Sequence, residues 1–173
     1  MRKIEFRGKP KAGYNYGKDW LYGSLIKIDE NNYGIIEPED ISCDENGYID
    51  YAHTPVQIET IGQFTGLTDK NGKEIYEGDI VLCKEFDNKG MSLLGHSERE
   101  LFTIDELKGR KNAEYISEVF YNEANFYVNE GSRCEVPLCC FFGNMKNSSP
   151  IYEIKIIGSI HDNPELLTPE IEI

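Results

Sequence analysis

The stretch from Asp69 to Asp79 holds the side chains of this sequence that are best suited to acid and base chemistry. They are Asp69, Lys70, Glu74, Tyr76, Glu77 and Asp79. Carboxylates, an amine and a phenol at such short spacing could exchange protons with a substrate. Turn chemistry explains the same residue types, because Asp and Lys solvate a turn and Asp79 can cap backbone N–H groups ahead of a strand. No His, Ser or Cys lies in this stretch to act as a nucleophile, so we interpret it as structural.

Cysteine and histidine are the other residues that could carry chemistry. The five cysteines are Cys43, Cys83, Cys134, Cys139 and Cys140, and the three histidines are His53, His96 and His161. Zinc sites usually present ligands in pairs a few residues apart, whereas this sequence has one loose cluster at 134–140 that His161 could approach. No histidine adjoins a cysteine as a thiolate nucleophile would require. We therefore expect reduced, metal-free cysteines, no cofactor and no catalysis.

The charge balance limits the classes of partner. The chain has 173 residues and a net charge of −13, with an isoelectric point near 4.7. Phosphate backbones are bound by Lys and Arg, so we expect no direct contact with DNA or RNA. Trp20, Tyr22 and Tyr33 could form a stacking platform for bases, but core packing is the commoner fate of such residues. No Walker loop or dinucleotide fingerprint occurs.

The sequence also predicts where the protein works. The first eight residues are charged throughout and do not resemble a secretory signal, and no run approaches the roughly 20 apolar residues of a membrane span. We expect a cytoplasmic protein that does not enter membranes. Homo-oligomerisation is left open.

The elements that position the 69–79 stretch are turns and strands. Asn71-Gly72 predicts a two-residue type I′ hairpin turn, with positive φ at both residues. A second turn at Glu77-Gly78-Asp79 leads into an apolar run, 80–83, that is typical of a buried strand. The turn residues favoured for a structural role are Thr65, Gly66, Asp69, Asn71, Gly72, Tyr76, Gly78 and Asp79.

The remaining sequence alternates short strands and turns, which predicts a mainly β protein built as small barrels or a sandwich. Ile4 and Phe6 suggest an opening strand with one buried face, and the acidic segment 38–47 suggests a loop. Thr103-x-x-Glu106 fits a capping box for a short helix at 104–108, and Pro164 begins a helical turn. Further strands are expected at 20–28, 33–36, 48–51, 56–59, 113–121, 125–128, 135–142 and 151–157.

Three separated blocks resemble the YopX-like family of phage and prophage proteins. They are the opening residues 2–9, the central block Gln-Phe-Thr-Gly-Leu-Thr-Asp-Lys-Asn-Gly-Lys-Glu-Ile-Tyr-Glu-Gly-Asp-Ile-Val at 63–81, and the closing residues 157–167. The resemblance implies an SH3-like small β-barrel and a phage or prophage origin, and it brings no catalytic residue with it.

These observations give the following expected organisation. We expect an N-terminal β region at 1–59, a β-barrel region at 60–167 with a short helical insertion at 88–112, and a frayed tail at 168–173. The leading hypothesis for function is a non-enzymatic protein-interaction module that binds an unidentified host or phage protein. The alternatives are an acidic mimic of nucleic-acid charge that binds a DNA-binding protein, and a small hydrolase or nucleotide-binding enzyme.

Overall fold

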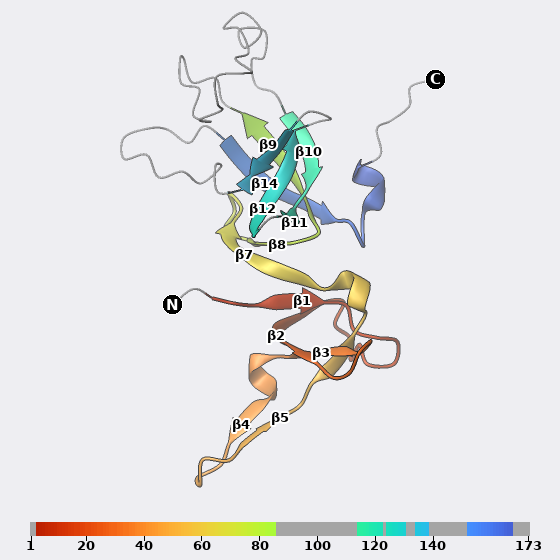
Figure 1. Ribbon diagram of the computed structural model, residues 1–173, viewed down its shortest axis with the longest axis vertical. Coiled ribbons are helices and arrows are strands. Elements are labelled where there is room, and N and C mark those ends of the chain that lie inside the picture. Colours follow the sequence, from red (N-terminus) through yellow and green to blue (C-terminus); the bar gives the residue numbers. More distant parts are fainter. Residues whose placement is uncertain (1–2, 86–113, 123, 131–133, 139–151, 168–173) are drawn as a thin grey trace, which may run out of the picture.

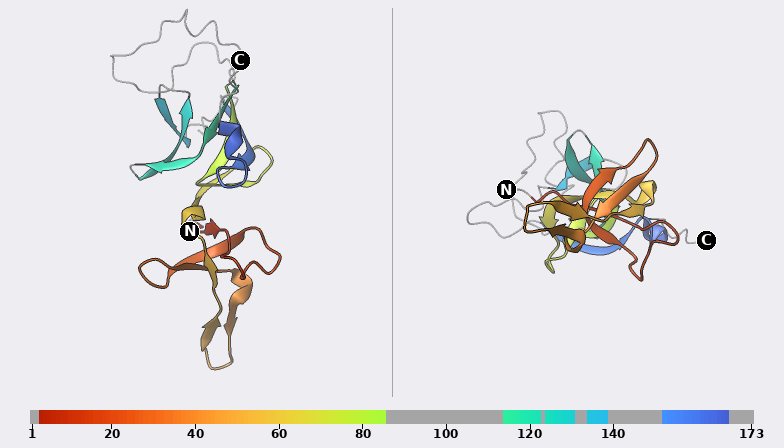
Figure 2. Two further views of the ribbon diagram at one scale, coloured as in Figure 1. Left: turned by 90° about the vertical axis from the view of Figure 1, so that its right-hand side faces the viewer. Right: turned by 90° about the horizontal axis from the view of Figure 1, so that it is seen from below.

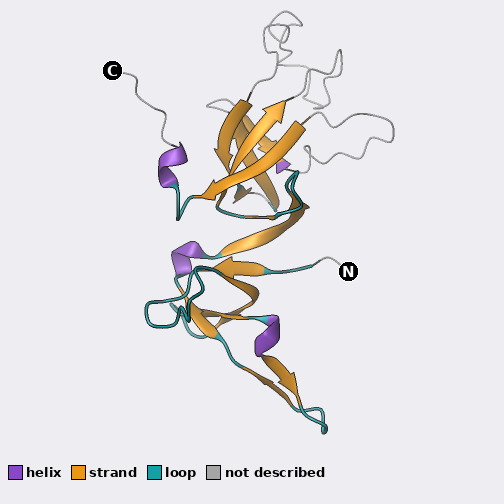
Figure 3. Cartoon of the chain, turned by 180° about the vertical axis from the view of Figure 1, so that it is seen from behind, coloured by secondary structure: helices purple, strands orange, loops and turns teal. Residues whose placement is uncertain are grey.

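The computed structural model describes residues 3–85, 114–122, 124–130, 134–138 and 152–167, and these are mainly β-structure (Figure 3). The expected mainly β class is confirmed. The predicted helix at 104–108, the insertion at 88–112, the tail at 168–173 and two of the cysteines, Cys139 and Cys140, lie outside the described residues.

One antiparallel sheet of six strands extends from the lower part of the molecule in Figure 1 up to β7 and β8. Its order is β6 (Thr54–Val56), β3 (Tyr33–Ile36), β2 (Leu21–Lys27), β1 (Phe6–Gly8), β7 (Gly62–Thr68) and β8 (Glu74–Tyr76). Strands β1 to β6 make up what we call the N-lobe. Its small core contains Leu21, Ile35 and Val56, with Leu25, Tyr33 and Ile61 packed against it.

Two three-stranded sheets form the C-lobe together with β8. One sheet has the order β10 (Glu114–Glu118), β9 (Asp79–Glu85) and β14 (Tyr152–Ser159); the other has β11 (Phe120–Asn122), β12 (Asn125–Glu130) and β13 (Cys134–Pro137). They curl around a larger core of Ile75, Val81, Cys83, Val119, Phe126, Val128, Leu138 and Ile154. The 3₁₀ helix η4 (Pro164–Leu167) is the expected C-terminal helical turn.

Strand β7 connects the two lobes, because its first residues pair with β1 and its later residues pair with β8. The backbones are close at this junction. A Cβ added to Gly62 would lie 2.4 Å from the carbonyl oxygen of Glu77. A residue with a side chain would therefore push β7 away from the turn before β9.

A two-stranded hairpin projects from the far end of the N-lobe, away from both cores (Figures 1 and 2). It consists of β4 (Ile41–Cys43) and β5 (Ile49–Tyr51), preceded by the 3₁₀ helix η1 (Pro38–Asp40). We call the segment from Asp40 to Ala52 the arm. Sequence reasoning placed a loop at 38–47 and missed β4, because two apolar positions among acidic residues give little strand signal.

Most other strands begin and end near their expected positions, with two differences. Ile4 is 70% exposed and precedes β1, so the opening strand starts later than its apolar pattern suggested. Residues 58–60 form the 3₁₀ helix η2 (Ile58–Thr60) instead of continuing a strand. Both differences occur at the ends of strands, where the local sequence pattern does not determine how far the pairing extends.

Candidate interaction surface

The carboxylate of Asp69 closes the hairpin between β7 and β8 and is buried. Its Oδ1 accepts hydrogen bonds from the backbone N–H groups of Asn71 at 2.8 Å and Lys73 at 3.0 Å, and its Oδ2 accepts one from Ile156 on β14 at 3.2 Å. The Lys70 N–H donates to the Ile154 carbonyl at 3.0 Å. The Asp69 carboxylate therefore ties the hairpin to the neighbouring sheet, as a structural role requires.

The loop itself is not the predicted type I′ turn. Gly72 has φ of +80°, but Asn71 has an ordinary negative φ. The Gly72 N–H donates to the Asp69 carbonyl, and the Asp69 N–H donates to the Lys73 carbonyl. This is a three-residue loop in which a left-handed glycine follows a normal turn. The Asp69 side chain favours this loop because its carboxylate accepts hydrogen bonds from the backbone N–H groups of Asn71 and Lys73.

Thr65 and Gly66 mark an irregularity in β7. The Thr65 hydroxyl donates to the Ile75 carbonyl at 2.8 Å, and Gly66 has φ of +86°. The register between β7 and β8 shifts between Phe64 and Thr68. This bulge turns the end of β7 toward the C-lobe.

Asp79 performs the predicted cap and also forms an ion pair between the lobes. Its Oδ2 accepts the Tyr76 N–H at 2.8 Å across the turn at Gly78, and its Oδ1 accepts from the Arg7 guanidinium at 2.6 Å. Both side chains are at least nine-tenths buried. Burial raises the pKa of Asp79, and the Arg7 charge opposes that shift. Sequence reasoning missed Arg7 because it lies 72 positions from Asp79.

Tyr76 completes this buried cluster. Its ring packs against Phe64 and Tyr22, and the Arg7 guanidinium lies 5.2 Å from its centre. The phenol donates toward Glu5 and lies 2.9 Å from Glu74. Burial raises the pKa of Tyr76, and its two carboxylate partners add to the shift. A phenol held protonated in this way joins strands and does not serve as a base.

A second polar contact joins the lobes around Trp20. The indole N–H donates to the Asp162 carboxylate at 3.0 Å, Lys9 pairs with the same carboxylate, and the Trp20 and His161 rings are 6.0 Å apart. Burial lowers the pKa of His161, and the nearby charge of Arg7 acts in the same direction. The structure does not bring Trp20, Tyr22 and Tyr33 together as a platform, because Tyr33 packs against the N-lobe core.

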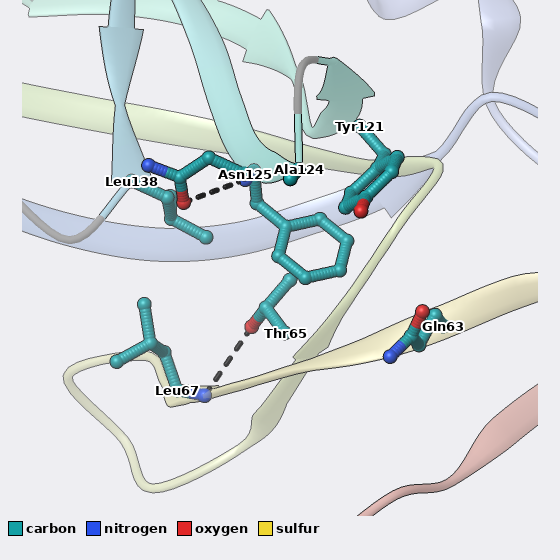
Figure 4. A pocket seen from close by; sticks show the side chains of 8 residues that line it. Gln63, Thr65, Leu67, Tyr121, Ala124, Asn125 and Leu138 are labelled. Atoms are coloured by element: carbon teal, nitrogen blue, oxygen red, sulfur yellow. Dashed lines mark hydrogen bonds between the residues drawn. The ribbon is translucent and has the colours of Figure 1, made fainter.

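One pocket lies between β7 and the β11–β12 hairpin and has a volume of about 230 Å³ (Figure 4). Its described lining carries no carboxylate, amine, imidazole or thiol. The lining consists of Gln63, Thr65, Leu67, Tyr121, Ala124, Asn125, Phe126 and Leu138. These side chains offer amides, hydroxyls and apolar contacts.

The arm presents a different kind of surface. The cross-strand pairs are Ile41 with Tyr51 and Cys43 with Ile49, so these four side chains share one face of the hairpin. The exposed fractions of Ile41, Ile49 and Tyr51 are 50%, 67% and 57%. We call this group the apolar face of the arm.

Acidic residues surround the apolar face. Between Ile28 and Asp69 the sequence holds nine Asp and Glu and no Lys or Arg. Lys18 pairs with Glu37 and Glu39 at the base of the arm. Among the described residues, no ion pair involves the three exposed carboxylates farther along it, which are Asp44, Glu45 and Asp50.

The comparisons with known proteins identify the family. The family model described as "YopX protein" matches residues 5–168. The chain belongs to the YopX family. A solved structure, protein EF1440 from Enterococcus faecalis, is similar over 97% of this chain and 100% of its own, with 21% sequence identity and a TM-score of 0.49. No match is found among proteins with curated functions.

The two cysteines of this YopX chain whose side chains the structure describes differ in exposure. Cys43 is exposed and Cys83 is buried. No group of three potential metal ligands occurs in the described part of the chain. In the same ranges, no helix is long and apolar enough to cross a membrane. The arm could have been found from Asp44-Glu45-Asn46-Gly47, which repeats the Asp-x-Asn-Gly pattern of the 69–72 loop.

Proposed function

We propose that this YopX-family chain is a non-enzymatic protein-interaction module, encoded by a phage or prophage and acting in the cytoplasm of the bacterial host. The proposal includes an SH3-like small barrel as the architecture of the C-lobe. The observation that supports a binding role is the exposed apolar face of the arm. Contiguous apolar groups on a protruding element are typical of protein interaction sites.

The family-signature residues support this assignment in a different way. The side chains of Asp69, Asp79 and Tyr76 are engaged in bonds that hold the hairpin, the turn and the two lobes together. Because these groups stabilise the scaffold, a binding function must use another surface. The arm is ordered, exposed and distant from both cores.

The test is affinity capture of partners from host cells with matched variants. Ile49→Thr/Tyr51→Thr makes the apolar face polar, and threonine is chosen because its β-branched side chain suits a strand. The control is Ile58→Thr, which makes the same change at a similarly exposed isoleucine in η2. We expect wild type and Ile58→Thr to retain the same partner while the double variant loses it. Equal capture by all three proteins would overturn the arm as the binding element. An activity screen in which turnover disappears on replacing His53 or His161 would overturn the non-enzymatic assignment.

The second candidate is an acidic mimic of nucleic-acid charge, which is favoured by the nine carboxylates between Ile28 and Asp69. A mimic would bind a DNA-binding protein through charge. Its binding would survive Ile49→Thr/Tyr51→Thr and would be lost when arm carboxylates are neutralised. The same capture experiment with Glu45→Gln/Asp50→Asn separates the two candidates.

A further inference from the structure

Acidic residues lie at both ends of the arm, and its apolar face lies between them. Its apolar face occupies the two strands, Asp40 lies at the base, and Asp44 and Glu45 lie in the loop at the tip. The Asp44 Oδ1 accepts the N–H groups of Tyr48 at 2.8 Å and Asn46 at 2.9 Å, which lowers the pKa of this carboxyl. The tip therefore keeps its negative charge at neutral pH.

The arm is built to remain ordered without a cover on its apolar face. An isolated two-stranded hairpin is at best marginally stable in water. Here the Ala52 N–H donates to the Asp40 carbonyl at 3.1 Å, and the Asp44 N–H donates to the Tyr48 carbonyl at 2.9 Å, so both ends are closed. Ordering before binding lowers the entropy cost of association.

We infer that the arm binds, apolar face first, to a protein surface that presents an apolar patch bordered by Lys or Arg side chains. This inference rests on the proposed interaction function and adds the chemistry of the partner. Side chains 41, 43, 49 and 51 supply the apolar contact, and the acids at the base and tip supply the complementary charge.

The negative charge of the arm also argues against three other binding partners, which are a second copy of the chain, nucleic acid and an anionic membrane. A second copy of the chain would bring two acidic arms together, and like charges across an interface oppose association. Nucleic acid and anionic membranes would be repelled in the same way. Because the contact relies on complementary charge at exposed positions, we expect salt-sensitive binding.

A peptide of defined composition tests the partner chemistry directly. The probe is a fluorescent Lys-Lys-Leu-Val-Leu-Val-Lys-Lys, with two matched peptides in which Glu replaces Lys or Ser replaces the apolar centre. Anisotropy is measured with wild type, with Ile49→Thr/Tyr51→Thr, and with Asp44→Asn/Glu45→Gln, which neutralises the two acids at the tip. The controls are Ile58→Thr and Glu30→Gln, which change the same exposed residue types outside the arm.

We expect the lysine peptide to bind wild type and both controls, with each arm variant weakening binding about tenfold or more. Raising NaCl to about 0.5 M should weaken it as well. Equal binding of the glutamate or serine peptide, or no binding of the lysine peptide, would overturn the inference. So would an arm-dependent dimer in sedimentation velocity.

Failure of this inference is distinguishable from failure of the proposed function. Suppose that a partner is captured from cells only when the arm is intact, but the lysine peptide does not bind. The interaction function then stands, and the inferred partner surface, an apolar patch bordered by Lys or Arg, is refuted. Peptide binding with no partner captured by any of the proteins refutes the interaction function, and equal capture by all of them refutes the arm as its binding element. Circular dichroism of each variant shows whether the fold is retained, and we expect no change because the altered side chains are exposed.

Discussion

Replacing Asp69 by Ala should destabilise the protein far more than replacing Asp44 by Ala. The two residues begin equivalent loops, because each Oδ1 accepts the backbone N–H groups two and four positions later. Only Asp69 is buried and also accepts the Ile156 N–H from a third strand. Asp44→Ala is therefore a matched control for the loop itself.

The magnitude follows from the hydrogen bonds that each substitution removes. Asp44→Ala removes two bonds in an exposed hairpin that can exchange them for water, so it should cost no more than about 1 kcal/mol. Asp69→Ala removes the same two bonds at a buried side chain and leaves the Ile156 N–H without its carboxylate. Since an unsatisfied buried group costs about 1–3 kcal/mol, we expect a total loss of about 3 kcal/mol.

Urea unfolding followed by circular dichroism measures both values. A difference in unfolding free energy below about 1 kcal/mol between the two variants would refute the role assigned to the Ile156 bond, because it would mean that loss of the buried carboxylate is tolerated as easily as loss of the exposed one. Asp69→Asn adds a finer test. It keeps one acceptor oxygen but places an amide donor where the second oxygen accepted, so it should fall between wild type and Asp69→Ala.

The pKa of Asp69 also predicts how the stability difference between wild type and Asp69→Ala depends on pH. Burial alone would raise the pKa of Asp69, but the N–H groups of Lys73, Ile156 and Asn71 outweigh burial and hold the pKa below its ordinary value. A lowered native pKa stabilises the fold above the unfolded pKa, and this stabilisation is lost as pH falls through the native pKa. The gap between wild type and Asp69→Ala should be constant above about pH 5 and should shrink below about pH 4.

Three further predictions follow from single contacts. Arg7→Met and Asp79→Leu should each cost about 3–5 kcal/mol in urea unfolding, and the double variant should cost less than their sum, because one partner alone leaves a buried charge; additive costs would contradict this. Gly62→Ala should lower the melting temperature more than Gly72→Ala. The new Cβ at position 62 would clash with the Glu77 carbonyl oxygen, whereas at position 72 it has space and the only cost is the positive φ, about 1 kcal/mol. The reverse order would contradict the close approach of the two backbones. A thiol reagent should label Cys43 in the native protein and leave Cys83 unmodified until unfolding, as judged by mass spectrometry of digests.

Local patterns predicted much of the fold because β-strands have a short sequence period. The range expected for β3, 33–36, is the observed one, and the strand at 80–83 lies within β9 (Asp79–Glu85). The Asp79 cap was also predicted, since its partner Tyr76 is three residues away. What could not be predicted are contacts across long sequence distances. Arg7 reaches Asp79 only because β7 pairs with both β1 and β8.

The arm shows why a local motif does not by itself locate function. Asp44-Glu45-Asn46-Gly47 and Asp69-Lys70-Asn71-Gly72 form the same loop, and the two glycines have φ values of +82° and +80°. Strand β14 lies beside the second loop, where the Ile154 carbonyl and the Ile156 N–H engage its backbone and carboxylate. No such strand lies beside the first loop in the described structure, so Asp44 and Glu45 stay on the surface next to exposed apolar side chains. The Asp-x-Asn-Gly motif thus specifies a hairpin end, and the presence or absence of a third strand decides whether that end stabilises the fold or is available to a partner.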